Sequence, residues 1–437
     1  MNIEGSQTTL NAVNLSSARD MRKVAMASAI GTMIEYYDFT LYTTATALVF
    51  NKIFFPSYDP LMGSLAAFTT YFVGYCSRPL GGVIFGHFGD RFGRKIMLLL
   101  TLMIMGIGTF LIGLIPPYAQ IGVWAPIMLV ILRILQGIGI GGEYGGGMTM
   151  MVEHAPAEKR GFYSSLVHIG VPAGFLVPII LIGVLENTLS PDGFLNWGWR
   201  IPFLLSLALL AVGIFIRFHI AETPSFKRVL QTGGRVNVPA FEAIRHHRHN
   251  MLFGIGAKVA ESGLFNIYAV FAISYGVNVL KLPNTLLLNG VLLACFLECF
   301  TLPLFGALSD RFGKRTVYCA GMLFQAVLAY PFFLLLDSGS TPLIYLAIAA
   351  GLALGHGSVY GAQGAFFSAL FPANIRYSGL SMVQQIGPIL GGGISPLVAT
   401  ALLIRFGDHA MVTVYMAAIA LLSALCALAL RPSREDA

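Results

Sequence analysis

Charged residues are scarce in this sequence. Asp, Glu, Lys and Arg make up 11% of its 437 residues, and 56% of the residues are hydrophobic. Soluble globular domains contain about 25% charged residues. The deficit excludes an ordinary soluble enzyme or binding domain, and we predict a polytopic membrane protein.

Cysteine is also rare. The five cysteines are scattered, odd in number and mostly inside apolar segments, which excludes a disulfide framework and a CxxC metal site. The His-rich run at 245–250 could be a metal site, but such a run at a membrane edge is more often a surface that faces headgroups or another domain. We see no nucleophile with its base, and we expect no enzyme activity, no cofactor and no metal.

The first 23 residues lack the charged start, short apolar run and cleavage site of a signal peptide. We expect them to form a cytoplasmic tail. Twelve apolar segments follow, each long enough to cross a hydrocarbon core of about 30 Å. They fall into two groups of six, at 24–219 and 250–430, separated by a polar linker at 220–249 and followed by a short cytoplasmic tail at 431–437.

The distribution of cations predicts the orientation. If both termini are cytoplasmic, twenty of the 27 Lys and Arg residues lie on that side and four on the other, while Arg78, Arg133 and Lys258 fall inside spans. Such a bias is typical of cytoplasmic loops. It also explains the net charge of +7 by orientation and contact with anionic lipid, so we expect no nucleic-acid partner.

A ten-residue stretch occurs twice in related form. GHFGDRFGRK begins at Gly86 and GALSDRFGKR begins at Gly306, 220 residues later. Both copies keep the first Gly and an Asp-Arg-Phe-Gly block, which contains Asp90 and Arg91 in the first copy and Asp310 and Arg311 in the second. A positive-inside loop would explain the cations alone, but not the glycines, the aspartates or the repetition.

The two stretches resemble the cytoplasmic loop signature of the major facilitator superfamily, whose twelve-helix transporters carry it after the second and eighth helices. The resemblance implies an all-α membrane fold of two pseudo-symmetric six-helix bundles. It also implies a cytoplasmic gate that latches the outward-open state, with Asp90 acting partly on a neighbouring helix N-terminus. The gate residues are Gly86, Asp90, Arg91, Arg94, Asp310 and Arg311.

Ionisable groups inside the spans are the strongest functional signal, because burying them costs several kcal/mol or more unless they are paired or hydrated. Glu35, Asp38 and Tyr42 share one stripe of the first span, a plausible proton-accepting face. Arg133 lies deep in the fourth span and needs a carboxylate partner or an anionic substrate. Glu143, in a glycine-rich run of the same span, is either a proton site or a structural partner.

Other polar groups in the spans are candidates for substrate binding. Lys258 and Glu261 are three residues apart and either neutralise each other or leave Lys258 facing a cavity. His356, Tyr360 and Gln363 form a polar stripe that can orient a hydroxylated ligand. The full set of predicted substrate-binding residues is Tyr42, Tyr75, Arg78, Arg133, Lys258, His356, Tyr360, Gln363 and Gln384.

Further resemblances narrow the function. Arg133 and Gln136-Gly137 resemble the fourth-helix signature of proton-coupled members of the superfamily, while EYYDFTLY at 35–42 and GGEYGG at 141–146 resemble its metabolite:proton symporter branch. Within that branch the chain is most similar to the shikimate permease type.

These resemblances imply a proton-coupled symporter of the bacterial inner membrane, monomeric, that imports a small organic acid such as shikimate by alternating access. Glu35, Asp38, Arg133 and Glu143 would carry the proton coupling. A carrier of di- or tricarboxylates or of a zwitterion such as betaine or proline is the alternative, with a drug/proton antiporter less favoured.

Overall fold

The computed structural model describes residues 18–55, 60–219 and 239–433, and within these ranges the regular secondary structure is entirely helical. Of the predicted terminal tails and linker, residues 1–17, 220–238 and 434–437 lie outside the described part. The described helices join into twelve long rods, six before the linker and six after it.

The first six rods carry the labels α2 to α11. In chain order they are α2 (Ala18–Ala45) with η1 (Thr46–Phe50) and α3 (Asn51–Ile53); α4 (Pro60–Phe92); α5 (Arg94–Leu114); α7 (Trp124–His154), preceded by the short α6 (Tyr118–Ile121); η2 (Ala157–Lys159) with α8 (Arg160–His168) and α9 (Gly170–Thr188); and α10 (Pro191–Gly193) with η3 (Phe194–Gly198) and α11 (Arg200–Phe218).

The second six rods follow α13 (Pro239–His246), a short helix inside the predicted linker. They are α14 (Arg248–Asn266) with η4 (Ile267–Phe271) and α15 (Ala272–Asn278); α16 (Asn284–Phe312); α17 (Lys314–Asp337); α18 (Thr341–Ala349) with η5 (Ala350–His356) and α19 (Gly357–Ser368); α20 (Arg376–Pro388) with η6 (Ile389–Gly393) and α21 (Ser395–Phe406); and α22 (Ala410–Ala429).

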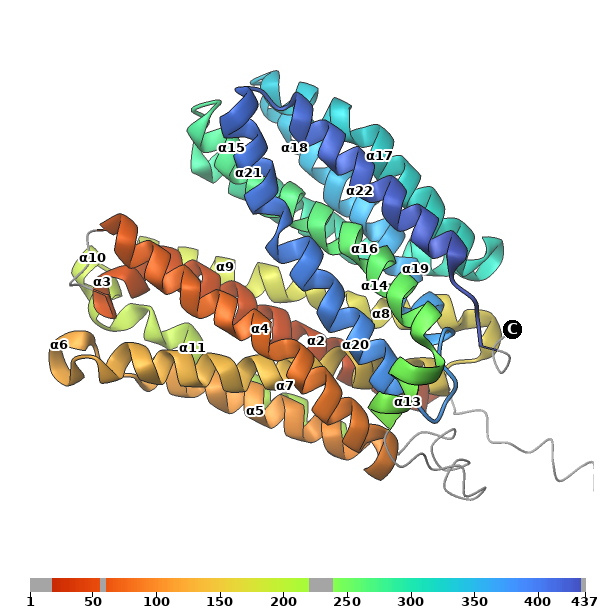
Figure 1. The fold of residues 1–437 in the computed structure, drawn as a ribbon. Helices are drawn as coiled ribbons and strands as arrows, with labels where there is room; N and C mark the ends of the chain where they lie inside the picture. The colour runs from red at the N-terminus through yellow and green to blue at the C-terminus, as the bar shows by residue number, and fades with distance from the viewer. Residues whose placement is uncertain (1–17, 56–59, 220–238, 434–437) are drawn as a thin grey trace, which may run out of the picture.

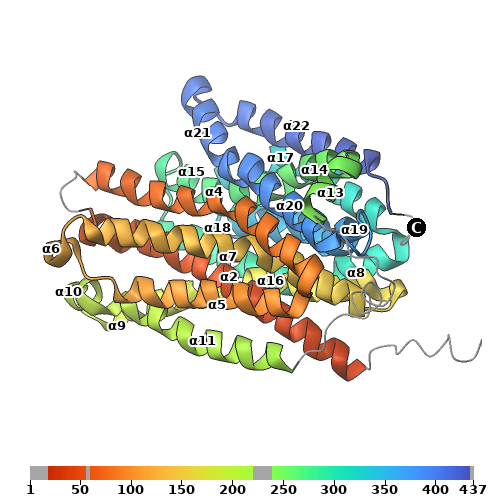
Figure 2. The same ribbon diagram turned by 60° about the horizontal axis from the view of Figure 1, so that its bottom comes forward.

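Each set of six rods forms its own bundle, as Figure 1 and Figure 2 show. We call them the N-half and the C-half. The end of the molecule that holds the two repeated stretches, between α4 and α5 and between α16 and α17, is the motif end. The halves pack against each other there, through α8 on α16 and α19 and through α4 and α7 on α20. They diverge toward the opposite far end, which carries α10 and α15 (Figure 1).

Among the described residues, nine helices are long and apolar enough to span a membrane by length and composition alone. The remaining three rods are those of α2, α4 and α14. They contain ionisable residues in mid-helix, such as Asp38, Arg78 and Lys258, and are therefore less apolar than the other nine. The twelve-helix architecture predicted from the sequence is confirmed.

Glycines on α7 allow the close packing inside the N-half. A Cβ atom on Gly141 would lie 2.7 Å from the backbone nitrogen of Gly82 on α4, so only a bare backbone fits at this crossing. Further along α7, a side chain at Gly146 would meet Tyr377 of the C-half at 2.7 Å. The glycine-rich run therefore serves two interfaces, one inside the N-half and one between the halves.

Candidate functional site

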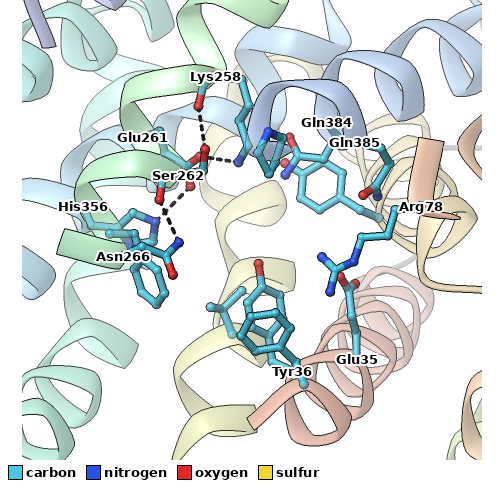
Figure 3. A pocket seen from close by; sticks show the side chains of 15 residues that line it. Glu35, Tyr36, Arg78, Lys258, Glu261, Ser262, Asn266, His356, Gln384 and Gln385 are labelled. Atoms are coloured by element: carbon cyan, nitrogen blue, oxygen red, sulfur yellow. Dashed lines mark hydrogen bonds and ion pairs between the residues drawn. The ribbon is translucent and has the colours of Figure 1, made fainter. Parts of the chain in front are cut away.

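A cavity lies between the two halves near the middle of the rods. Its volume is about 610 Å³ including the part open to solvent. Figure 3 shows that polar side chains from both halves point into it. The charged and polar residues that line it are Glu35, Tyr36, Arg78, Tyr144, Lys258, Glu261, Ser262, Asn266, His356, Gln384 and Gln385.

The N-half wall carries one carboxylate and one guanidinium. Glu35 on α2 and Arg78 on α4 extend toward one another (Figure 3), and both side chains are buried. The Arg78 guanidinium also lies 5.4 Å from the centre of the Phe39 ring, a cation–π distance. Oε2 of Glu35 has no hydrogen-bond partner among the described residues. This wall therefore presents a cation and a carboxylate oxygen to a ligand.

The C-half wall carries a chain of charged groups. Lys258 forms an ion pair with Glu261 on the same helix, and the other oxygen of Glu261 lies 3.0 Å from Nε2 of His356. Nδ1 of His356 in turn lies 2.5 Å from Glu298 on α16. The sequence left open whether Lys258 pairs with Glu261 or faces the cavity, and the structure shows that it does both.

Aromatic and amide groups in and behind the cavity wall join the two halves. Tyr144 of the N-half contacts Nε2 of His168 at 2.9 Å and accepts a hydrogen bond from Gln363 of the C-half at 3.4 Å. Gln363 also donates to Gln384 at 3.1 Å. The Tyr360 ring stacks on His168 with 3.7 Å between ring centres. Tyr360 and Gln363, predicted to bind substrate, are therefore one layer behind the cavity lining.

A second buried ion pair lies inside the N-half. Nη1 of Arg133 donates to Asp38 at 2.9 Å, and Asp38 also accepts hydrogen bonds from Gln136 at 2.6 Å and Thr109 at 2.7 Å. The Tyr42 ring lies 4.1 Å from the Arg133 guanidinium. Arg133 and Tyr42 do not line the cavity, whereas both were predicted to bind substrate; the Tyr75 side chain lies outside the described residues.

Glu143 has a different partner. It forms an ion pair with Arg217 of α11 and accepts a hydrogen bond from Thr101 at 2.8 Å. The charge count places Arg217 among the twenty cations of the cytoplasmic side, and the structure shows that its side chain is buried there, 3% exposed. Glu143 was considered either as a proton site or as a structural partner. Its contacts with Arg217 and Thr101 are those expected of a structural partner.

The two repeated aspartates make equivalent contacts across the halves. Asp90 accepts hydrogen bonds from the backbone N–H groups of Tyr377 and Ser378 and from the Ser378 hydroxyl, at the start of α20. Asp310 accepts from the backbone N–H groups of Gly161 and Phe162, at the start of α8. Each carboxylate thus caps a helix N-terminus of the opposite half.

Other residues of the repeated stretches divide into two kinds. A Cβ on Gly86 would lie 2.8 Å from Cα of Ser378, so glycine is needed for this close approach. Arg94 is buried and bridges the halves, donating to the Ala373 carbonyl at 2.7 Å and to Glu153 at 3.3 Å. Arg91 and Arg311, by contrast, are exposed and lie over neighbouring phenylalanine rings.

The predicted site omits Glu298, which completes the chain on the C-half wall, and Arg217, which pairs with Glu143. Glu261 was considered as a partner of Lys258, and the structure adds its contact with His356. A buried charge requires a partner, but the partners of Glu298 and Arg217 are distant in sequence, so only the packing of the helices identifies them.

Two bundles of six helices that meet at one end and enclose a charged cavity between them are the architecture of a membrane transporter. The Major Facilitator Superfamily model matches residues 28–383 and 291–437. The chain belongs to this family, and it is therefore a transporter and not an enzyme.

Several known proteins are similar over almost the whole chain. The shikimate transporter of Escherichia coli K12 is 41% identical, covering 95% of each chain. The proline/betaine transporter of Salmonella typhimurium is 33% identical, covering 97% of this chain and 86% of its own. Among solved structures, the proton:xylose symporter XylE bound to 6-bromo-6-deoxy-D-glucose matches with a TM-score of 0.76 at 16% identity, covering 94% of this chain and 95% of its own.

Proposed function

We propose that this transporter is a proton-coupled symporter of the bacterial inner membrane that imports a small hydroxylated monocarboxylate, with shikimate as the first candidate. The observation that carries the proposal is the cavity, in which each half contributes one cation, Arg78 or Lys258, beside one carboxylate. The shikimate transporter, 41% identical over 95% of each chain, supports the same substrate.

The cavity has suitable partners for such a ligand. A substrate carboxylate would bind Arg78 or Lys258, because a guanidinium or ammonium in a water-poor site forms strong charge-assisted hydrogen bonds. Ser262, Asn266 and Gln384 provide donors and acceptors for ring hydroxyls. This polar lining fits a ligand that carries several hydroxyl groups on one ring better than it fits a largely apolar molecule. A drug exporter is therefore disfavoured.

We assign the coupled proton first to Asp38. Its pair with Arg133 is buried and separate from the cavity lining, so a proton can bind there without competing for the substrate's position. Protonation would remove the negative charge that compensates Arg133 and leave a buried cation without its counterion. The helices around this pair would then rearrange, which links proton binding to the change of access.

A zwitterion is the second candidate substrate. The cavity contains Glu35 and Glu261 as well as two cations, so a ligand with both charges would also find partners. The 33% identity to a proline/betaine transporter favours this alternative over di- and tricarboxylates.

The test is uptake by the purified protein in proteoliposomes. With no membrane potential imposed, radiolabelled shikimate should accumulate above its external concentration only when the outside is more acidic than the inside, and a protonophore should abolish the accumulation. Unlabelled 2-oxoglutarate, citrate, benzoate and betaine, added as competitors, rank the alternatives. Entry that only equilibrates shikimate at every imposed pH gradient would contradict symport and indicate a channel or uniporter.

A further inference from the structure

The scheme above uses Lys258 and Glu261 for the substrate but gives no role to His356 and Glu298, the other two members of the chain of charged groups on the C-half wall. Glu298, at its buried end, is 0% exposed, and its second oxygen has no hydrogen-bond partner among the described residues. Lys258, Glu261 and His356 line the cavity, whereas Glu298 lies behind His356. The chain therefore runs from the substrate space into the interior of the C-half.

Hydrogen-bond accounting shows that the chain must carry an extra proton. Both ring nitrogens of His356 face carboxylate oxygens, Nε2 toward Glu261 at 3.0 Å and Nδ1 toward Glu298 at 2.5 Å. A neutral imidazole has only one N–H, so one of these contacts would otherwise bring two lone pairs together. Either His356 is protonated on both nitrogens or one carboxyl group carries a proton.

The surroundings indicate where that proton lies. Lys258 pairs with Glu261 and keeps that carboxylate ionised, which leaves His356 and Glu298 as the holders. Across the cavity the charged groups are Glu35 and Arg78. The other titratable side chains on the elements packed around the chain are one histidine, four tyrosines and two cysteines: His168, Tyr144, Tyr318, Tyr360, Tyr268, Cys295 and Cys299.

With the proton bound, the chain is electrically balanced, because Lys258 and the proton offset the two carboxylates. Without it, a net negative charge remains in a buried site, which is costly. A substrate carboxylate that draws Lys258 away from Glu261 increases the same imbalance. Binding of an anion at Lys258 and binding of a proton in the chain therefore favour each other.

We infer that Lys258, Glu261, His356 and Glu298 form a second proton-binding site, located in the C-half and separate from Asp38, in which His356 and Glu298 hold the proton. The inference rests on the proposed function, since a carboxylate substrate bound at Lys258 is what retains the proton in the site. The site makes the transport of each substrate molecule depend on two protons, one from each half.

The experiment counts protons. In proteoliposomes, proton uptake and radiolabelled shikimate uptake are measured together, and shikimate exchange at equal pH on both sides is measured separately. Glu298→Gln retains a hydrogen-bonding partner for His356 but cannot titrate. We expect the proton-to-shikimate ratio to fall by half in this variant while exchange continues. In His356→Gln, whose side chain also lines the cavity, we expect the same fall in the ratio and make no demand on the exchange rate.

Thr301→Val is the matched control, because Thr301 lies one turn along α16 and donates to the Ala353 carbonyl at 2.6 Å without titrating; its ratio should equal that of the wild type. An unchanged ratio in Glu298→Gln overturns this site alone. Wild-type uptake without proton flux overturns the proposed function as well. If both chain variants fail to reach the membrane while Thr301→Val does, the chain is a structural tie between α14, α16 and η5, and the inference is wrong.

Discussion

At the scale of single residues, three of the buried ion pairs stay within one half, whereas Arg376 of the C-half lies 3.4 Å from Glu153 of the N-half at the motif end. Asp38 pairs with Arg133 and Glu143 with Arg217 in the N-half, and Lys258 pairs with Glu261 in the C-half. Because none of these three pairs crosses between the halves, relative motion of the bundles need not separate their members. Each pair can instead respond to its own ligand or proton.

Two arginines of the N-half, Arg133 and Arg78, should have separable effects. Arg133→Ala removes the partner of Asp38, and we expect it to abolish proton-driven accumulation of shikimate while the protein remains in the membrane. Arg78→Ala removes a cavity cation, so shikimate binding should weaken by about 1.5–3 kcal/mol, roughly 10- to 100-fold in Kd. Binding measured by calorimetry and uptake measured in proteoliposomes separate these losses. Retained pH-dependent accumulation in Arg133→Ala would remove Arg133 from the mechanism.

Glu143 gives a test of stability. Glu143→Gln leaves Arg217 buried without its counterion, and we expect a loss of about 3–5 kcal/mol in the free energy of unfolding. The double variant Glu143→Gln with Arg217→Met removes both charges and should recover most of that loss. Unfolding of the detergent-solubilised protein, arranged as a double-mutant cycle, measures the coupling. A stable Glu143→Gln protein with altered proton coupling would show instead that Glu143 is a proton site.

The sequence predicted which residues matter better than it predicted their partners. Helical spacing placed Lys258 next to Glu261, because neighbours three residues apart share a face of the helix. Arg217 and Glu143 are 74 residues apart, and Glu298 and His356 are 58 apart. Such pairs depend on how each helix is rotated in its bundle, which hydrophobic periodicity does not determine when helices are apolar on every side.

At the scale of helices, the repeated stretches act through helix ends. Gly93 and Gly313 have φ angles of 118° and 95° and separate α4 from α5 and α16 from α17, a backbone conformation that favours glycine. The turns they form leave Asp90 and Asp310 in the last turn of the preceding helix. There each carboxylate reaches the N-terminus of a helix in the other half. The motif thus joins the halves at two related points.

Loss of one of these contacts should shift the population of conformations. Asp90→Ala removes the acceptor for three donors at the start of α20. A hydrogen bond to a charged group contributes about 1.5–3 kcal/mol, so the population open at the motif end should rise roughly 10- to 100-fold. The measurement is the rate at which an impermeant thiol reagent labels Ser381→Cys from the motif end.

Arg91→Gln is the matched control for this shift. Arg91 follows Asp90 directly but is exposed and lies over the Phe92 ring at 5.5 Å. The labelling rate should change much less than in Asp90→Ala. Equal effects of the two substitutions would mean that the charge of the loop, and not the helix cap, keeps the motif end closed.

At the scale of the whole molecule, the two halves are built alike and meet at the motif end. The closed motif end, the diverging far end and the cavity between them are consistent with one state of an alternating-access cycle. The charge bias of the loops predicts that the motif end is cytoplasmic. The state described would then be closed to the cytoplasm, and substrate would enter from the far end.

Single-cysteine labelling tests this orientation in a background without the five native cysteines. Arg91 and Arg311 are exposed at the motif end, while Asn187 and Ser338 are exposed at the far end. In intact cells, an impermeant maleimide should label Asn187→Cys and Ser338→Cys, whereas Arg91→Cys and Arg311→Cys should be labelled only after the cells are opened. The reverse pattern for all four positions would leave the fold intact but invert the direction of entry. Arg91→Cys and Arg311→Cys labelled from opposite sides would contradict the pairing of the two bundles, because both repeated stretches would no longer lie at one end.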